Sequence, residues 1–329
     1  MKKVVILHSD VAPDAGDDEL DCIRQAETIA EALQTLGYKP ELMPFVLDLG
    51  QNISALRRAN PCVVFNLVET IGGRGSLIHV APALLDFLQI PYTGCRTDAM
   101  FLTSNKPLAK KILNDAGVPT PAWITEEGML TGQISSDIFL VKASWEDASV
   151  GLDEGSIITS QDRSVIQSAV ADRRKKLGGA CFAEAYIDGR EFNIALLAKE
   201  CGVSLLPPAE MLFLNYPPEK LRILDYKAKW VENSFEYDNT RRTLNISPKD
   251  NLLIGKLNEI ALGCWHIFGL RGYARIDFRI DKNGHPWVLE INANPCLSLE
   301  AGFAFAVERA GLKYADAIEC IVKDALAGL

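Results

Sequence analysis

The sequence predicts an α/β (α+β) protein that begins with a doubly wound sheet and ends in an antiparallel hairpin. In residues 1–104, short apolar runs alternate with amphipathic helical patterns, which is typical of strands joined by helices that cover a parallel sheet. In residues 271–295, apolar and polar side chains alternate with period two on both sides of Asn283-Gly284. An Asn-Gly pair between two such runs is the strongest short-range signal of a hairpin.

Composition excludes several classes of protein. The chain has 329 residues, which is enough for two or three domains, and its net charge of -9 argues against a nucleic-acid partner. The apolar run in the opening MKKVVILHSD is too short for a signal peptide, and no run approaches membrane-spanning length, so we expect a cytoplasmic protein without a membrane partner. The eight cysteines form no C-x-x-C pair, so neither zinc nor disulfide bonds are expected.

The N-terminal alternation begins with a strand at residues 4–8 and a helix at residues 19–36. Strands at residues 41–45 and 62–68 continue it. No G-x-G-x-x-G follows the first strand, so dinucleotide binding is unsupported. The glycine-rich residues 72–76 lack the Lys-Ser/Thr ending of a P-loop, and we interpret them as a tight connection.

Two lysines stand at the ends of predicted elements in the middle of the chain. Lys106 begins a helix that accepts Pro107 in its first turn and that Gly117 ends. Lys142 follows a predicted strand at residues 138–141. Taken alone, such lysines are most simply solvated charges.

The following part of the chain mixes strands, connections and one long helix. Four segments are predicted there: strands at residues 181–185 and 191–197, a Pro-rich connection at residues 206–218, and a mobile polar lid at residues 231–246. Ser247 then caps a helix that Gly269 ends.

The hairpin places two acids opposite each other. If a two-residue turn at Asn283-Gly284 sets the register, Asp277 pairs with Glu290, and Asn292 lies on the same face. Two carboxylates about 5 Å apart repel by roughly 3 kcal/mol at an effective dielectric of about 20, so a positive charge is needed between them. Mg²⁺ suits such a set of oxygens. The alternative is a solvated hairpin face on which Arg279 neutralises its neighbours.

The motif Arg-x-Asp, turn, Glu-x-Asn-x-x-Pro resembles the metal-binding hairpin of the ATP-grasp ligases, most closely that of D-alanine:D-alanine ligases. Matching segments in the same order are residues 65–67, 90–94, 106–121, 141–151, 184–192 and 225–230. The resemblance implies the ATP-grasp fold, in which an N-terminal α/β domain is followed by two α+β subdomains that grip ATP. The implied divisions are residues 1–104, 105–190 and 191–329.

The resemblance also implies roles for individual residues. Asp277, Glu290 and Asn292 would hold Mg²⁺, with two ions expected and Mn²⁺ as an alternative, while Arg275 would stabilise the oxyanion in catalysis. The residues expected to bind ATP are Lys106, Lys142 and Lys229 at the phosphates, the last also assigned to catalysis, Ser149 in the flap over them, Glu184, Ala185, Ile187 and Ile223 at the adenine, and Glu191 at the ribose.

The substrate end departs from the ligase pattern. A serine of the flap is replaced by Ala148, a tyrosine by Trp230, and the Ser-Leu pair that binds the acceptor carboxylate by Ala301-Gly302. Asp18 or Glu19 is a candidate for receiving a substrate amine, or is simply an acid in the first turn of a helix. Cys296 is interpreted as packing or lining the substrate site rather than as a nucleophile.

Together these features predict an ATP-dependent carboxylate–amine ligase that forms an amide through an acylphosphate. The expected partners are ATP and small carboxylate and amine substrates other than two D-alanines, and a homodimer is an expectation from the resemblance. Two alternatives stay open: a genuine D-alanine:D-alanine ligase of cell-wall synthesis, and an ATP-binding regulatory protein without catalysis.

Overall fold

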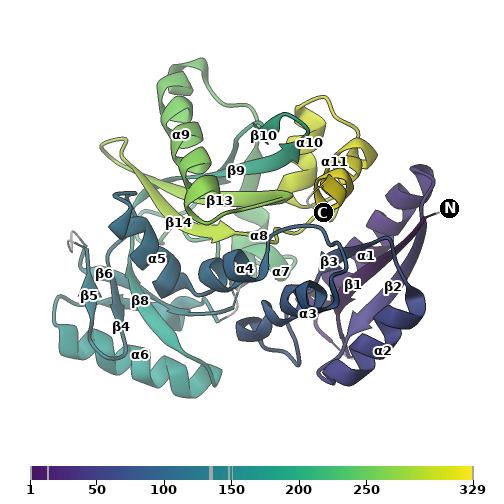
Figure 1. Ribbon diagram of the computed structural model, residues 1–329. Coiled ribbons are helices and arrows are strands. Elements are labelled where there is room, and N and C mark those ends of the chain that lie inside the picture. Colours follow the sequence, from purple (N-terminus) through teal and green to yellow (C-terminus); the bar gives the residue numbers. More distant parts are fainter. Residues whose placement is uncertain (1, 13–14, 133–135, 147–148, 150, 328–329) are drawn as a thin grey trace.

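The computed structural model describes residues 2–12, 15–132, 136–146, 149 and 151–327. It is a mixed α/β protein with three sheets, one parallel and two antiparallel, which lie in three lobes of the ribbon (Figure 1). The α/β (α+β) class predicted from the sequence is therefore confirmed. The division at residues 104 and 190 stays a prediction, and the third sheet begins at Gly189.

The first lobe is a parallel sheet with the strand order β2-β1-β3. Its elements are β1 (Lys3–Ser9), α1 (Asp17–Thr35), β2 (Lys39–Phe45), α2 (Leu49–Ala59), β3 (Val63–Leu67), a 3-10 turn (Gly75–Leu77), α3 (Val80–Leu88) and α4 (Thr97–Ser104). Because side chains alternate along a strand, Val4 and Ile6 of β1 pack with the helix α1, while Val5 and Leu7 pack in a second core on the other face. Both faces are covered, as predicted for a doubly wound sheet.

The second lobe is an antiparallel sheet with the order β5-β4-β8-β6-β7. Its elements are α5 (Lys106–Asp115), β4 (Trp123–Thr125), β5 (Leu130–Thr131), β6 (Ile138–Ala143), a 3-10 turn (Glu154–Ser156), β7 (Ile157–Thr159), α6 (Arg163–Leu177) and β8 (Cys181–Ala185). Helix α6 covers the outer face, where Ile166 and Val170 pack on Val141 and Ala183 (Figure 1). The alternate residues of β6 and β8 are thereby turned to the inner face.

The third lobe is an antiparallel sheet with the order β12-β11-β9-β13-β14, and β10 pairs with β9. Its elements are β9 (Gly189–Lys199), β10 (Gly202–Leu205), β11 (Ala209–Phe213), α7 (Tyr226–Trp230), α8 (Phe235–Asn239), β12 (Thr240–Thr243), a 3-10 turn (Pro248–Asp250), α9 (Asn251–Ile267), β13 (Tyr273–Asp281), β14 (Pro286–Asn292), α10 (Gly302–Arg309) and α11 (Tyr314–Ala327). As predicted, Ser247 caps the turn into α9, and Gly269 follows it in a left-handed conformation.

One prediction for this lobe is wrong. The Pro-rich residues 206–218 were expected to be only a connection, but they contain the strand β11, and the prolines lie outside it. Strand pairing needs N–H groups, and residues 209–213 retain all of theirs. The expected polar lid at residues 231–246 contains α8 and β12, and β12 pairs with β11. That this segment is a mobile lid stays a prediction.

The hairpin has the predicted pairing at its open end but not the predicted turn. Asp277 pairs with Glu290 and Arg275 with Asn292, yet Phe278 pairs with Val288, because a bulge adds Leu289 to β14. Gly284 has a φ of +79°, whereas Asn283 is not among the residues with positive φ, so the two-residue type I′ turn is wrong. The bulge also makes Val288, rather than its two neighbours, the buried residue of this part of β14.

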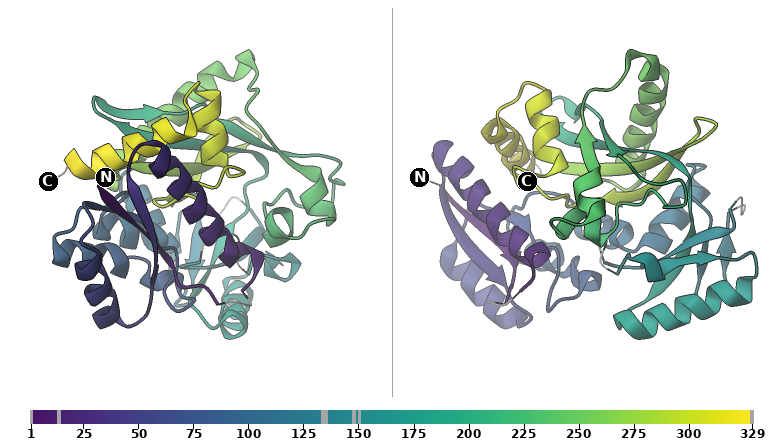
Figure 2. Two further views of the ribbon diagram at one scale, coloured as in Figure 1. Left: turned by 90° about the vertical axis from the view of Figure 1, so that its right-hand side faces the viewer. Right: turned by 180° about the vertical axis from the view of Figure 1, so that it is seen from behind.

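The first and third lobes share one hydrophobic core. Residues Ile29 and Leu33 of α1 pack with Ile318, Ile321 and Val322 of α11, and the two helices lie side by side (Figure 2). This shared core fixes the edge of the parallel sheet beside the large antiparallel sheet. Among the helices in the described ranges, none is both long enough and apolar enough to cross a lipid bilayer.

A glycine at the start of β9 provides a test of this packing. A Cβ at Gly189, whose φ is +156°, would lie 1.8 Å from the carbonyl oxygen of Ile280 in the paired strand. We therefore expect Gly189→Ala to lower the free energy of unfolding by about 2 kcal/mol or more, measured by urea denaturation. The control is Gly263→Ala in α9, where nothing lies within 4 Å of the new Cβ. It should be neutral or stabilising by up to about 1 kcal/mol; equal effects of the two substitutions would contradict the argument.

Candidate active site

A cleft of about 850 Å³ lies between the three lobes. It is lined by the following residues that the sequence singled out: Lys106, Lys142, Ser149, Glu184, Ala185, Ile187, Glu191, Ile223, Lys229, Trp230, Arg275, Asp277, Glu290, Asn292 and Cys296. Glu19, by contrast, is exposed and is not among the cleft-lining residues in the described part of the chain, and the side chain of Asp18 lies outside that part. The structure thus brings together residues from segments far apart in the sequence.

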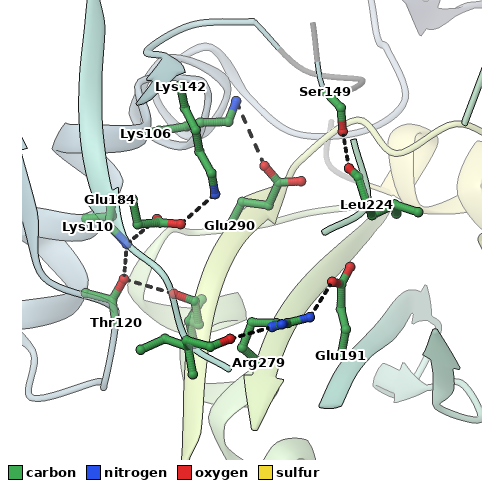
Figure 3. Close-up of polar contacts among 12 residues, drawn as sticks. Lys106, Lys110, Thr120, Lys142, Ser149, Glu184, Glu191, Leu224, Arg279 and Glu290 are labelled. Carbon is green, nitrogen blue, oxygen red and sulfur yellow. Dashed lines mark hydrogen bonds and ion pairs between the residues drawn. The ribbon is translucent and has the colours of Figure 1, made fainter. Parts of the chain in front are cut away.

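The wall formed by the second lobe carries a buried carboxylate between two lysines (Figure 3). Glu184 of β8 is 2% exposed, and its two oxygens lie 2.5 Å from Nζ of Lys142 and 2.8 Å from Nζ of Lys110. Lys110 also donates to Thr120 Oγ1, which donates to the carbonyl of Val288. Burial would raise the pKa of Glu184, but the two ammonium groups hold it below its usual value.

Lys110 was missed in the sequence, although a signal for it exists. It is 1% exposed and lies one helical turn after Lys106, so both lysines project from one face of α5 toward the cleft wall. Burial lowers the pKa of Lys110, and the charge of Glu184 opposes this effect. Glu184 itself, at 2% exposed, is not a solvated residue of its strand.

The opposite wall is the hairpin, where counter-charges separate the two facing acids. Arg275 holds Asp277 through two hydrogen bonds of 2.7 Å, and Asp277 also accepts from the amides of Asn193 and Asn292. Nζ of Lys106 lies 4.0 Å from Glu290. Burial would raise the pKa of Glu290, but the positive charges led by Lys106 lower it to about 2. Glu290 is therefore ionised at neutral pH.

The residues present fit a magnesium ion. Two carboxylates and one amide oxygen are ligands of the kind that Mg²⁺ takes together with phosphate oxygens and water. Asn292 currently donates its N–H to Asp277 at 3.0 Å, and a half-turn of the amide would present its oxygen instead. Within the described ranges no group of three or more His, Cys, Asp or Glu side chains is arranged to hold a metal.

The part of the cleft expected to hold the nucleoside contains a buried ion pair. Arg279 is 3% exposed, donates to the carbonyl of Ile187 at 3.0 Å, and pairs with Glu191 at 3.2 Å (Figure 3). Arg279 therefore does not neutralise a solvated hairpin face, as the alternative interpretation had it. Arg279 lies two residues after Asp277 in β13, so both side chains lie on the same face of the strand and line the same cleft. Ser149 donates to the carbonyl of Leu224 at 2.7 Å and so ties the flap to this side.

Lys229 reaches the cleft from the short helix α7. Asp225 caps this helix by accepting from the backbone of Ala228. Burial lowers the pKa of Lys229, and the negative charge that opposes this effect most strongly is that of Glu290. The neighbouring Trp230 also lines the cleft. Asp147 and Ala148 of the flap lie outside the described residues.

The substrate end joins the first lobe to the loop after the hairpin. Cys296 donates its thiol to Asp21 at 3.0 Å, and Ser298 donates to the same carboxylate at 3.1 Å. Burial first, then the charges of Asp21 and Glu69, raise the pKa of Cys296, so the thiol stays protonated. This supports the interpretation of Cys296 as a lining residue. Asp21 of α1 lines the cleft, whereas Glu19 of the same helix does not.

The glycine-rich residues 72–76 contact the flap region. The backbone N–H of Gly75 lies 3.3 Å from both oxygens of Glu146, and Lys106 donates to the carbonyl of Glu146 at 2.8 Å. A Cβ at Gly75 would lie 2.5 Å from the carbonyl of Trp145. The tight connection predicted here is thus also a close contact between lobes.

The fold and the cleft together define the class of the protein. Two antiparallel sheets face each other across the cleft, with lysines on one wall and the carboxylates of a hairpin on the other. This is the arrangement of the ATP-grasp class. Within it, the model of the family described as "D-ala D-ala ligase C-terminus" matches residues 115–323. The chain belongs to the D-Ala–D-Ala ligase family of ATP-grasp enzymes.

The chain is similar to two named proteins at about 30% sequence identity. The chain is 30% identical over 308 residues to a protein of Sinorhizobium fredii named "Uncharacterized protein y4sG", covering 91% of this chain and 86% of that one. It is 29% identical over 304 residues to a D-alanine–D-alanine ligase of Aquifex aeolicus, covering 91% and 94%. Among solved structures, a D-alanine–D-alanine ligase of Bacillus anthracis complexed with ATP superimposes with a TM-score of 0.73 at 18% identity, covering 100% of this chain and 98% of that one.

The buried carboxylate gives a prediction of stability. Lys110→Met removes one partner of Glu184, and breaking a buried ion pair in this way should lower the free energy of unfolding by about 3 kcal/mol at neutral pH. Because the folded-state pKa of Glu184 lies below its ordinary value of 4.5, the ionised group contributes stability above that pH and loses it as the pH falls through the folded value. The loss of Lys110 raises the pKa of Glu184 in the variant. The difference in free energy of unfolding between the variant and the wild type should therefore become smaller as the pH is lowered toward 4.5.

Urea denaturation at several pH values measures this, with Lys111→Met as the matched control. Lys111 is the next residue of α5 and forms an exposed pair with Asp115. Its loss should cost less than about 1 kcal/mol. If both methionine variants had the same stability at neutral pH, the buried pair would not have the importance assigned to it.

Proposed function

We propose that the protein is an ATP-dependent carboxylate–amine ligase that forms an amide through an acylphosphate. The observation that carries this proposal is the meeting of Lys106, Lys142 and Lys229 with the hairpin acids Asp277 and Glu290 in one cleft. Cationic groups set against a pair of metal-binding acids suit the polyphosphate of a nucleotide. The similar ligase of Bacillus anthracis was solved as a complex with ATP, which supports the same assignment.

Each group has a stated part in the reaction. The first substrate's carboxylate attacks the γ-phosphorus of ATP, and ADP leaves while the three lysines offset the phosphate charge. The amine of the second substrate then attacks the acyl carbon, loses a proton, and expels phosphate. Arg275, kept charged by Asp277, stabilises the oxyanion of that step. Asp277, Glu290 and Asn292 would hold magnesium, which supplies further neutralisation of phosphate charge when bound.

The substrates proposed are not two molecules of D-alanine. Trp230 and Ala301 line the cleft at positions where the resemblance places a tyrosine and a serine, and Ala148 is a third such change in the sequence. The loss of one buried hydrogen-bond partner costs about 1–3 kcal/mol, so three changes together would leave D-alanine poorly held. A nucleotide-binding regulatory protein without catalysis is disfavoured, because a binding role alone does not require Arg275.

ADP release tests the reaction class. With ATP and magnesium, the purified protein should release ADP faster with one particular pair of carboxylate and amine than with either member alone. The panel holds D- and L-amino acids, dipeptides and other small carboxylates. Glu290→Gln should reduce the stimulated rate by about 100-fold or more, and a chelator should abolish it. Tight ATP binding with no stimulation across the panel would favour the regulatory alternative.

D-alanine tests the substrate proposal. As the only amino acid added, it should give no saturable ADP release at ordinary millimolar concentrations, because its holding groups are changed. The product assay is chromatography of D-alanyl-D-alanine. Efficient formation of this dipeptide would contradict the proposal and show that the protein is a genuine D-alanine:D-alanine ligase.

A further inference from the structure

The substrate end of the cleft contains an arginine that the hairpin chemistry does not use. Arg242 lies on β12 and lines the cleft next to the first turn of α10. Its guanidinium carbon lies 5.5 Å from the ring centre of Phe305, and NH1 donates to the carbonyl of Glu300 at 3.3 Å. That is the one side-chain hydrogen bond of Arg242 within the described residues, and the residue is exposed, so its remaining N–H groups are open to a ligand.

Gly302 makes the room for this arginine. A Cβ at Gly302 would lie 3.3 Å from Nε of Arg242, 3.4 Å from its Cζ and 3.6 Å from NH2. Gly302 does not have a positive φ, so its backbone conformation is one that any residue adopts. The requirement for glycine here is therefore space for the guanidinium. A leucine at this position, as in the ligase pattern, would push Arg242 out of its place.

The surroundings favour an anionic ligand at Arg242. Arg242 and Arg275 line the same cleft. Desolvation by the surrounding protein and then the positive charge of Arg275 lower the pKa of Arg242. Two like charges held together are relieved when an anion binds between or beside them. A guanidinium presents paired N–H groups that match the two oxygens of a carboxylate.

We infer that Arg242, admitted by Gly302, binds the carboxylate of the amine-bearing substrate. The inference rests on the proposed function and deepens it: the second substrate is an amino acid or peptide with a free carboxylate, held by a different group from the Ser-Leu pair of the ligase pattern. Arg242 thereby replaces the contacts of that pair with a charged one. The two changes belong together, because even a Cβ at residue 302 would crowd the guanidinium at 3.3 Å.

The kinetic test compares Arg242→Gln, Gly302→Leu and the wild type with each amino acid that stimulates ADP release and with its amide. Arg242→Gln should raise the KM for the amino acid by about 10–100-fold, as expected for the loss of hydrogen bonds to a charged group, and should leave the KM for ATP within about twofold. Gly302→Leu should act in the same direction, and the double variant should be little worse than either single one. Amides should not serve as the second substrate. Arg309→Gln, which removes an exposed arginine at the other end of α10, is the control and should change neither KM.

A binding measurement keeps the outcomes separate. Calorimetry on the protein with ADP and magnesium uses glycine, D- and L-alanine, short peptides and the corresponding amides as probes. Carboxylate-dependent binding that Arg242→Gln abolishes supports the inference even if no pair stimulates ADP release, which would overturn the proposed function alone. Ligation with amines that lack a carboxylate would uphold the proposed function and overturn the inference. Binding of none of the probes, or equal binding to wild type and Arg242→Gln, would also overturn it.

Discussion

Counter-charge across the cleft is the interaction on which the site depends. Glu184 is held by Lys110 of α5 and Lys142 of β6, and Glu290 of β14 is faced by Lys106 of α5. A carboxylate removed from water costs several kcal/mol unless cations reach it. Each acid is therefore stable only when another element supplies a lysine. Helix α5 supplies one to each wall, so its position between the second lobe and the hairpin is fixed by charge as well as by packing.

The same balance prepares the cleft for a polyanion. Lys106, Lys110, Lys142, Lys229 and Arg275 are five positive groups against the three carboxylates Glu184, Asp277 and Glu290, which leaves a surplus of two positive charges among them. Burial lowers the pKa of Lys229, so the protein surroundings of this lysine disfavour its charged state. The negative charge of a phosphate chain would favour that state, so we expect nucleotide binding to offset part of the cost of burying the lysine.

The sequence predicted the hairpin acids through two errors that cancel. Asn283-Gly284 suggested a two-residue turn, and the actual turn differs, but the bulge at Leu289 restores the pairing of Asp277 with Glu290. The alternation of side chains and the turn residues are enough to predict this pairing. They do not identify Lys110, Asp21 or Arg242, whose roles depend on which distant element packs beside them. Strand β11 was missed because its prolines suggested a loop, although they lie outside the paired residues.

The two ends of the cleft obey different constraints. At the phosphate end, Glu184 and Glu290 are each paired with a lysine of another element, so substitution of such a lysine removes a partner of a carboxylate and is unfavourable. At the substrate end, Arg242 rests on the ring of Phe305, the carbonyl of Glu300 and the open space at Gly302. None of these contacts is a buried ion pair, so residues there can change in pairs at small cost. A family with this architecture can therefore keep its phosphate chemistry while its substrates change. Gly302 and Arg242 are an example of two residues at the substrate end that change together.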